Sequence, residues 1–309
     1  MKIREEIKSK LYIKQWSIGV AKGSFSDFLK KGHTGLQYKW ISPKEKTRLF
    51  ADPFIFDGKD NDYKIIYEDL CLIEGFGKLS VTNIDRNLNV LSSSVVLNTG
   101  KHISYPKTLY MDNKLLVIPE SSASNQLISY EYDFNKNKLI NKVALIEKKE
   151  LLDSTILYHE NKYWLFATHL GNNSNSELYI YYSRSLYGPY EEHQLNPVKK
   201  SLNGSRPAGN FIKFNHCVYR PAQNNEEYYG KSITLFKINK LTENEFSEEE
   251  IIEIKPPVNS AFSHGIHTIN FLNEIIVIDG LRIIFSPIDK INIYLNKIKK
   301  LMFARKHKD

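Results

Sequence analysis

Aspartate and arginine side chains stand at the start of segments whose pattern is otherwise that of apolar strands. Asp52, Asp153 and Arg206 each occupy such a position. Polar side chains in an apolar strand destabilise the fold unless they are paired with other polar groups, so an unpaired one indicates a role in binding or catalysis. Carboxylates act as general bases or hold sugar hydroxyls, and guanidinium groups bind phosphate oxygens through two hydrogen bonds. These residue types therefore indicate chemistry on a sugar or on a phosphate group.

These positions belong to a repeat in which a polar turn and an apolar strand precede a second turn and an aromatic-rich strand. The pattern occurs five times, with steps of 53, 48, 53 and 58 residues. Each unit holds about four short strands, which predicts an all-β fold, a five-bladed β-propeller. A sandwich with coincidental turn spacing is the alternative. The blades are expected to open near residues 51, 104, 152, 205 and 263, at Asp52, Tyr105, Asp153, Arg206 and His264.

The two ends of the chain differ from the repeats. Residues 11–20 alternate loosely and are expected to supply the outer strand that closes the last blade. Residues 286–289 carry a helix-capping pattern with Pro287 at the first position, and apolar residues follow at helical spacing with lysines on the other face. We therefore expect a propeller over residues 1–285 and a basic amphipathic helical tail over 286–309.

The net charge of +8 is concentrated in this tail. Seven Lys or Arg and no acidic residue lie between positions 290 and 308, so the body is nearly neutral. A neutral body does not suit nucleic-acid binding, whereas a basic amphipathic helix suits a membrane surface. A capping helix that packs on the propeller is the alternative. With two cysteines and no signal peptide or membrane span, the expected location is cytoplasmic, peripheral on the inner face of the cell membrane.

Several phrases resemble known families. Ala-Asp-Pro-Phe at 51–54, Leu-Asp-Ser-Thr at 152–155 and Ser-Leu-Tyr-Gly-Pro-Tyr at 185–190 resemble the five-bladed glycosidases around glycoside hydrolase family 43. Ser-Arg-Pro-Ala-Gly at 205–209 and Tyr-Arg-Pro-Ala-Gln at 219–223 resemble more closely the propeller at the N-terminus of glucosamine inositolphosphorylceramide transferases and its stand-alone bacterial relatives. The resemblance covers roughly residues 16 to 285.

The hydrolase resemblance implies that Asp52 is the general base and that Asp153 tunes pKa values and orients the sugar. The general acid of that family is a glutamate that opens the fourth blade, where this chain has Arg206. Hydrolysis of a glycoside needs a protonated carboxyl to assist the leaving alkoxide, and an arginine cannot donate that proton.

A phosphate leaving group needs charge stabilisation instead of a proton. We expect Arg206 and Arg220 to bind phosphate oxygens, with Lys107 as a point charge nearby. Asp52 then activates the acceptor hydroxyl, while Asp153 and Glu120 hold sugar hydroxyls. Further substrate contacts are expected from Tyr105 as a stacking face and from His264, His267 and Asp279.

These roles predict a glycosyltransferase-like enzyme of bacterial glycan or surface-polysaccharide synthesis. The expected partners are a nucleotide sugar or phosphosugar donor, a glycan or lipid-linked acceptor and the membrane surface. No cofactor and no metal site are predicted, although His264 and His267 would allow an ion in the channel. Two alternatives stay open: a glycoside hydrolase or phosphorylase with Glu120 as an unorthodox acid, and a non-catalytic sugar-binding propeller.

Overall fold

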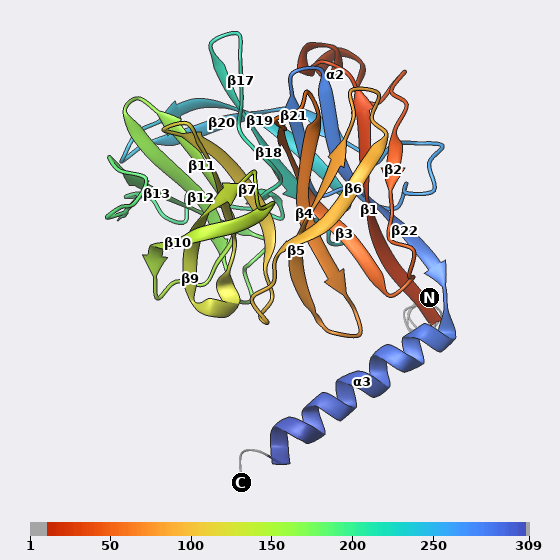
Figure 1. Ribbon diagram of the computed structural model, residues 1–309. Coiled ribbons are helices and arrows are strands. Elements are labelled where there is room, and N and C mark those ends of the chain that lie inside the picture. Colours follow the sequence, from red (N-terminus) through yellow and green to blue (C-terminus); the bar gives the residue numbers. More distant parts are fainter. Residues whose placement is uncertain (1–10, 307–309) are drawn as a thin grey trace.

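Five antiparallel sheets follow one another around a central axis in the computed structural model, which describes residues 11–306 (Figure 1). The prediction of an all-β, five-bladed propeller is confirmed. Phe54 and Phe56 from the first blade pack with Val117 and Tyr132 from the second, in one of several clusters that fill the spaces between blades. The many aromatic residues of the chain therefore stabilise the contacts between sheets.

Four blades follow directly along the chain. From the inner strand outward, the first blade contains β3 (Arg48–Asp57), β4 (Tyr63–Cys71), β5 (Phe76–Ile84) and β6 (Val90–Leu97), and the second contains β7 (Ser104–Met111), β8 (Lys114–Glu120), β9 (Gln126–Asp133) and β10 (Lys138–Glu147). The third blade contains β11 (Leu151–His159), β12 (Lys162–His169) and β13 (Glu177–Ser183), which pairs with β14 (Glu191–Glu192) and β15 (Lys199–Lys200). The fourth contains β16 (Asn203–Pro207), β18 (Cys217–Asn224), β19 (Ser232–Leu241) and β20 (Phe246–Ile254), and β17 (Ile212–Phe214) also pairs with β18.

The fifth blade joins the two ends of the chain. Its strands are β21 (Ile269–Leu272), β22 (Ile275–Phe285), β1 (Tyr12–Lys22) and β2 (Lys39–Ile41). β1 pairs with β22 along its whole length, from Tyr12 opposite Phe285 to Lys22 opposite Ile275. The N-terminal segment thus closes the last blade as expected, but as its third strand, because β2 takes the outer position.

The inner strands of three blades share one backbone feature. Asp52, Tyr105 and Asp153 all have positive φ, at 52°, 42° and 48°, and each lies in a bulge that shifts the register of its strand. A bulge bends the strand and turns a side chain away from the regular alternation. Positive φ is uncommon outside glycine, so the repeated strain at one position of three blades marks a shared role for these residues.

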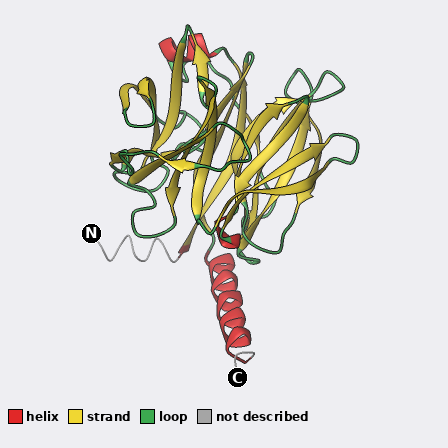
Figure 2. Ribbon diagram, turned by 90° about the vertical axis from the view of Figure 1, so that its left-hand side faces the viewer, coloured by secondary structure: helices red, strands yellow, loops and turns green. Residues whose placement is uncertain are grey.

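The helices lie on opposite faces of the propeller (Figure 2). α2 (Phe25–Lys31) follows β1, with the Ser24 side chain capping its first turn, and lies on the face where the inner strands end. α3 (Pro287–Lys306) follows β22 and leaves from the face where the inner strands begin. A short 3-10 turn, η1 (Ser122–Ser124), lies on this second face. Among the residues described, no helix is both long enough and apolar enough to cross a membrane.

Arg220 is a structural residue of the fourth blade, which corrects the expectation that it binds substrate. Its side chain is 2% exposed and forms two hydrogen bonds to Glu248 on β20, at 2.9 and 2.7 Å. It also donates to the Gly204 carbonyl at 2.6 Å, and Lys199 pairs with the same glutamate. A guanidinium that is buried and paired in this way is not available to a phosphate.

Removing the acidic partner should reveal this structural role. Glu248→Ala leaves Arg220 buried without its partner, so the free energy of unfolding should fall by about 3–5 kcal/mol. Glu249→Ala on the same strand is the matched control, because Glu249 is half exposed and pairs with Lys237 at the surface. The control should lose less than about 1 kcal/mol. Urea unfolding of the two variants measures the difference, and equal losses would contradict the assignment.

Candidate active site

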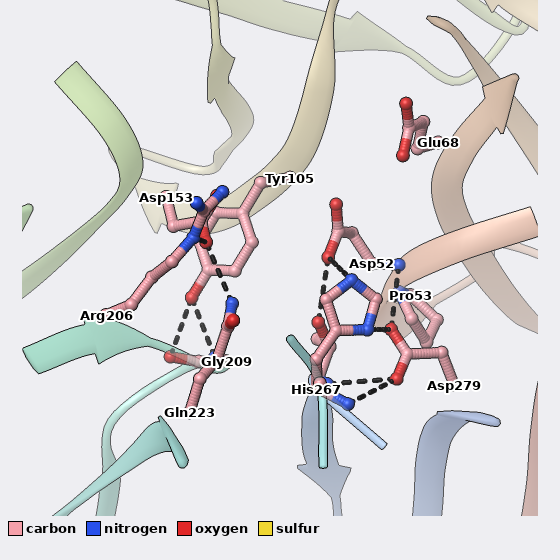
Figure 3. Close-up of polar contacts among 12 residues, drawn as sticks. Asp52, Pro53, Glu68, Tyr105, Asp153, Arg206, Gly209, Gln223, His267 and Asp279 are labelled. Carbon is pink, nitrogen blue, oxygen red and sulfur yellow. Dashed lines mark hydrogen bonds and ion pairs between the residues drawn. The ribbon is translucent and has the colours of Figure 1, made fainter. Parts of the chain in front are cut away.

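Side chains from all five blades meet near the start of the inner strands, in two groups (Figure 3). One group contains Asp52, His267 and Asp279. The other contains Asp153 and Arg206, with Tyr105 beside them. The bulges described above direct Asp52, Tyr105 and Asp153 toward this place, so the prediction that blade openings converge holds for the first four blades. In the fifth blade His267 takes the position expected for His264.

His267 lies between two carboxylates. Its Nδ1 is 2.7 Å from Asp279 Oδ2, and its Nε2 is 3.4 Å from Asp52 Oδ1. Asp279 also accepts the backbone N–H groups of His267 and Thr268 at 2.9 and 3.0 Å and that of Asp52 at 3.2 Å. Asp279 therefore fixes both the histidine and the backbone that carries Asp52, across the junction between the last blade and the first.

The titration of this group follows from its burial and its charges. Burial disfavours the charged imidazole, but Asp279 and Asp52 outweigh it and raise the pKa of His267 to about 9. Burial raises the pKa of Asp52 to about 6, with the positive charge of His267 opposing the rise. Thr268 donates to Asp52 Oδ1 at 2.8 Å, while the other carboxylate oxygen points away from this group (Figure 3). Asp52 thus keeps one oxygen for a ligand and is ionised at neutral pH.

Asp153 and Arg206 form the second group. Arg206 donates to both oxygens of Asp153, from Nε at 2.5 Å and from Nη2 at 3.2 Å, and its Nη1 reaches Asn175 at 3.2 Å. Gln223 also donates to Asp153, at 3.0 Å. The arginine that occupies the place of the hydrolase's general acid is therefore bound by Asp153, the second acid of the same resemblance. Three of its five N–H groups form hydrogen bonds inside the protein.

Tyr105 is buried completely, which corrects its expected role as a stacking face for a sugar. Its hydroxyl accepts the Gly209 N–H at 2.7 Å and lies 2.8 Å from Thr155 Oγ1. Its ring meets Phe54 edge to face, with centroids 5.0 Å apart. Tyr105 therefore connects its own blade, the second, with the first, third and fourth blades.

Two buried glutamates occupy matching positions in the first two blades. Glu68 on β4 lies opposite Ala51, the residue before the bulge in β3. Glu120 on β8 lies opposite Ser104, the residue before the bulge in β7. Burial, and then the negative charge of Asp153, raise the pKa of Glu120 to about 8. Burial raises the pKa of Glu68 well above its usual range, with Asp52 adding to the effect. The Glu120 carboxyl therefore carries a proton at neutral pH.

Glycine at position 77 makes room for Glu68. A Cβ at this position would lie 2.6 Å from Glu68 Oε1 and 2.7 Å from the Ile103 carbonyl. The Gly77 N–H donates to His102 Nδ1 at 3.0 Å, so in the neutral ring the proton is on Nε2. That nitrogen lies 3.6 Å from Glu68 Oε1, and the His102 side chain is 39% exposed. The imidazole thus connects the buried carboxyl with the surface.

Two other predicted contacts lie apart from the site. His264 is exposed, on the loop before β21. Lys107 is 4% exposed and donates to the Thr108 carbonyl at 2.5 Å, and burial lowers its pKa to about 7. Its ammonium group is therefore only partly charged at neutral pH and is not presented at the mouth of the channel.

Tyr229 is a site residue that sequence reasoning missed. It lies on the loop between β18 and β19 and is 40% exposed. Its ring stands over the Arg206 guanidinium at 5.5 Å, and its centroid is 5.4 Å from that of His267. Trp16 of β1 covers the other side of the histidine, with centroids 4.2 Å apart. Tyr229 offers the exposed aromatic face that Tyr105 does not, and no strand pattern marks its loop.

Asp52, His267 and Asp279 are also the residues that could hold a metal ion, since one ligand atom from each lies within 4.8 Å of the others. A metal ligand must be deprotonated, and the raised pKa of His267 opposes this. The two aspartates already compensate the charge of the imidazolium. The arrangement therefore fits a buried ion pair that orients Asp52 better than it fits a metal centre.

Comparison with known proteins adds a family match. The sequence profile described as "Glucosamine inositolphosphorylceramide transferase 1, N-terminal" matches residues 41–264. The chain is 31% identical over 209 residues to glucosamine inositolphosphorylceramide transferase 1 of Oryza sativa subsp. japonica, and 32% identical over 213 residues to that of Arabidopsis thaliana. The two alignments cover 65% and 66% of this chain but only 28% and 27% of the plant proteins.

Solved structures of glycoside hydrolases share the fold. Zg3597, a family 117 glycoside hydrolase of Zobellia galactanivorans, superposes with a TM-score of 0.52 at 12% identity and covers 90% of this chain and 92% of its own. An exo-β-1,3-galactanase of Clostridium thermocellum gives 0.54 at 9% identity, over 69% of this chain and 53% of its own. At this identity the likeness establishes the propeller fold alone.

The protonated groups of the site predict how stability depends on pH. Asp52, Glu120 and His267 all have raised pKa values, so these three groups bind more protons in the folded state than in the unfolded state between about pH 4 and pH 9. Their contribution to the free energy of unfolding should therefore fall as the pH rises across this range. Glu120→Gln removes one of these groups and should flatten the fall between about pH 4.5 and pH 8, by on the order of 2–4 kcal/mol.

Chemical unfolding of both proteins at several pH values measures this effect. Glu147→Gln is the matched control, because Glu147 is exposed at the outer edge of the same blade and should leave the slope unchanged. Parallel curves for the parent and the Glu120 variant would mean that Glu120 titrates normally in the folded protein.

Proposed function

Because the chain belongs to the family of the N-terminal domain of glucosamine inositolphosphorylceramide transferase 1, we propose that it is a glycosyltransferase-like enzyme. In this proposal it transfers a sugar from a phosphate-activated donor to an acceptor hydroxyl, in glycan or surface-polysaccharide synthesis, and the reaction takes place in the propeller channel. The plant relatives are named as transferases, and the match spans 28% or less of their length. The activity is therefore argued from the site of this chain.

The observation that carries the proposal is the pair of unlike carboxyl groups, Asp52 and Glu120. Asp52 has a pKa of about 6 and is ionised at neutral pH, whereas Glu120 has a pKa of about 8 and is protonated. Carboxyl groups whose environments separate their pKa values in this way serve as base and acid of one reaction. Asp52 accepts the proton of the acceptor hydroxyl, and His267 and Thr268 hold it in position.

Glu120 and Arg206 then act on the donor. The proton of Glu120 forms a hydrogen bond to a phosphate oxygen, which also avoids the repulsion that an ionised glutamate would cause. Arg206 supplies positive charge, although its pairing with Asp153 leaves chiefly Nη1 for the substrate. Tyr229 covers this end of the site and stacks on the apolar face of a sugar ring. Lys107 and Arg220, which are bonded elsewhere, have no part in the proposed mechanism.

A glycoside hydrolase or phosphorylase is the second candidate, and one observation favours it. A protonated Glu120 supplies what a poor alkoxide leaving group requires. The two reactions make different demands on this residue, since a sugar phosphate needs little proton transfer to leave and a glycoside needs a complete one. The leaving group therefore separates the candidates.

Changing the base should abolish turnover without affecting donor binding. Asp52→Asn keeps the oxygen that Thr268 binds, so the fold should survive while kcat falls about 10²–10⁴-fold. The parent should show a bell-shaped profile of kcat/KM with limbs near pH 6 and pH 8. Turnover of a panel of nucleotide sugars and sugar 1-phosphates measures the rate, and calorimetry measures donor binding. A variant that keeps the parental rate would exclude Asp52 as the base.

A leaving-group series decides between the two candidates. Glu120→Gln keeps a hydrogen-bond donor and loses the transferable proton. With phosphate-activated donors its rate should fall less than about tenfold, and with alkyl glycosides a hydrolase would lose about 10²–10⁴-fold. Matched phosphate, aryl and alkyl derivatives of one sugar make the comparison. Turnover of alkyl glycosides alone, with that large loss in the variant, would replace the transferase by the hydrolase. Binding of sugars without any turnover would leave a binding module.

A further inference from the structure

The loops around the candidate site lie on the face where the inner strands begin, which we call the mouth face, and the C-terminal helix leaves from the same face. The inner strands begin on this face, and the side chains that surround the site come from its loops. Tyr229 comes from the loop between β18 and β19, Asn175 from the loop after β12, and Ser122, which donates to Glu120, from η1. β22 ends on this face, and α3 leaves from there, opposite to α2 (Figure 2).

Contacts of α3 support this placement. Lys300 donates to the Glu74 carbonyl, in the turn between β4 and β5, which lies on the mouth face. At the start of the helix the Ser286 N–H bonds to the Leu11 carbonyl, and Ser286 Oγ donates to Asp289 at 2.5 Å. The helix therefore begins at a fixed position beside the mouth and reaches the edge of the first blade.

The surface of α3 carries exposed apolar groups and basic groups. Ile288, Ile291, Tyr294, Leu295 and Met302 are between 48% and 73% exposed and share one side of the helix at 3.6 residues per turn. Lys297 and Lys299 are exposed as well. Asp289 in the first turn is followed by seven Lys or Arg without an acidic residue up to position 308.

We infer that α3 lies in the surface of a bilayer that contains anionic lipids and holds the mouth of the channel toward it. An apolar side that enters the acyl boundary, next to lysines that meet lipid phosphates, is the pattern of an interfacial helix. A second copy of this chain would bring the same positive charges together, which disfavours self-association through α3. If the proposed function holds, the site on this face then takes an acceptor hydroxyl on a lipid-linked sugar.

Vesicle binding tests the helix without any need for turnover. The full chain should cosediment with vesicles of phosphatidylcholine and phosphatidylglycerol at low salt, and only weakly with phosphatidylcholine alone. Reversing two charges with Lys297→Glu and Lys299→Glu should weaken binding at least about tenfold. The matched control is Lys59→Glu with Lys136→Glu, which has the same net charge but changes exposed turns on the opposite face. Equal binding by the parent, the tail variant and the control would overturn the inference.

The two native cysteines report the orientation. Cys71 ends β4 on the mouth face, and Cys217 begins β18 on the opposite face. A spin label on Cys71 in the Cys217→Ser protein should be relaxed by a nickel-chelating lipid in the vesicle, whereas a label on Cys217 in the Cys71→Ser protein should not. A response of the Cys217 label alone would place the wrong face on the membrane and overturn the inference.

These outcomes are independent of the proposed function. A protein that binds vesicles with the mouth toward the bilayer, but turns over no activated sugar, keeps this inference and loses the proposed reaction. A protein that turns over soluble acceptors but does not bind anionic vesicles keeps the proposed reaction and loses this inference. If both hold, the tail variant should retain kcat on a soluble acceptor and lose rate only on an acceptor embedded in vesicles.

Discussion

The pairing of the first strand with the last is the interaction on which the rest of the structure depends. β1 lies along β22 from Tyr12 to Lys22, so residues at the two ends of the chain form one sheet. β1 covers the edge of β22 that would otherwise lack a strand partner, so the last blade becomes a complete four-stranded sheet. It also places Trp16 against His267 and brings Asp279 within hydrogen-bond reach of the Asp52 backbone. The catalytic geometry that we propose therefore requires the ring to be closed.

Closure also determines the electrostatics of the channel. Asp52, Glu68, Glu120, Asp153 and Asp279 are all buried, and Arg206 and His267 are the cations that pair with the aspartates. Ionised carboxylates at such a density would repel one another in a medium of low polarity. Arg206 pairs with Asp153, and His267 pairs with Asp279 and lies 3.4 Å from Asp52. Glu120 keeps its proton at neutral pH because its pKa is raised to about 8, and burial raises the pKa of Glu68 as well.

Arg206 stands where the hydrolases have a glutamate, and the sequence predicts that its charge is free to bind a phosphate. In the folded protein it is paired with a carboxylate instead. The guanidinium is bound by Asp153, so much of its charge is compensated inside the protein before any substrate arrives. Glu120, two blades away, is the protonated carboxyl that the proposed reaction uses in place of that glutamate. In this proposal the site keeps an acid and a base, and the acid lies on a different blade.

Local sequence patterns were sufficient to predict the fold and the polar residues of the inner strands. A repeat of turn and strand residues is local information, because each blade is a single antiparallel unit whose strands follow one another along the chain. Asp52, Asp153 and Arg206 were identifiable for the same reason, since each stands at the same place in its unit. The basic tail and the participation of the N-terminal strand in the last blade were equally readable from local pattern.

Which of these groups contact one another depends on the folded ring and could not be predicted from local patterns. Arg220 pairs with Glu248 on the outer strand of its own blade, and Tyr105 is fully buried. His267 takes the place expected for His264, and Asp279 binds its backbone N–H. Tyr229 reaches the mouth on a loop that no periodic pattern describes. The protonation of Glu120 depends on burial and on charges more than thirty residues away, and such long-range effects exist only once the ring has closed.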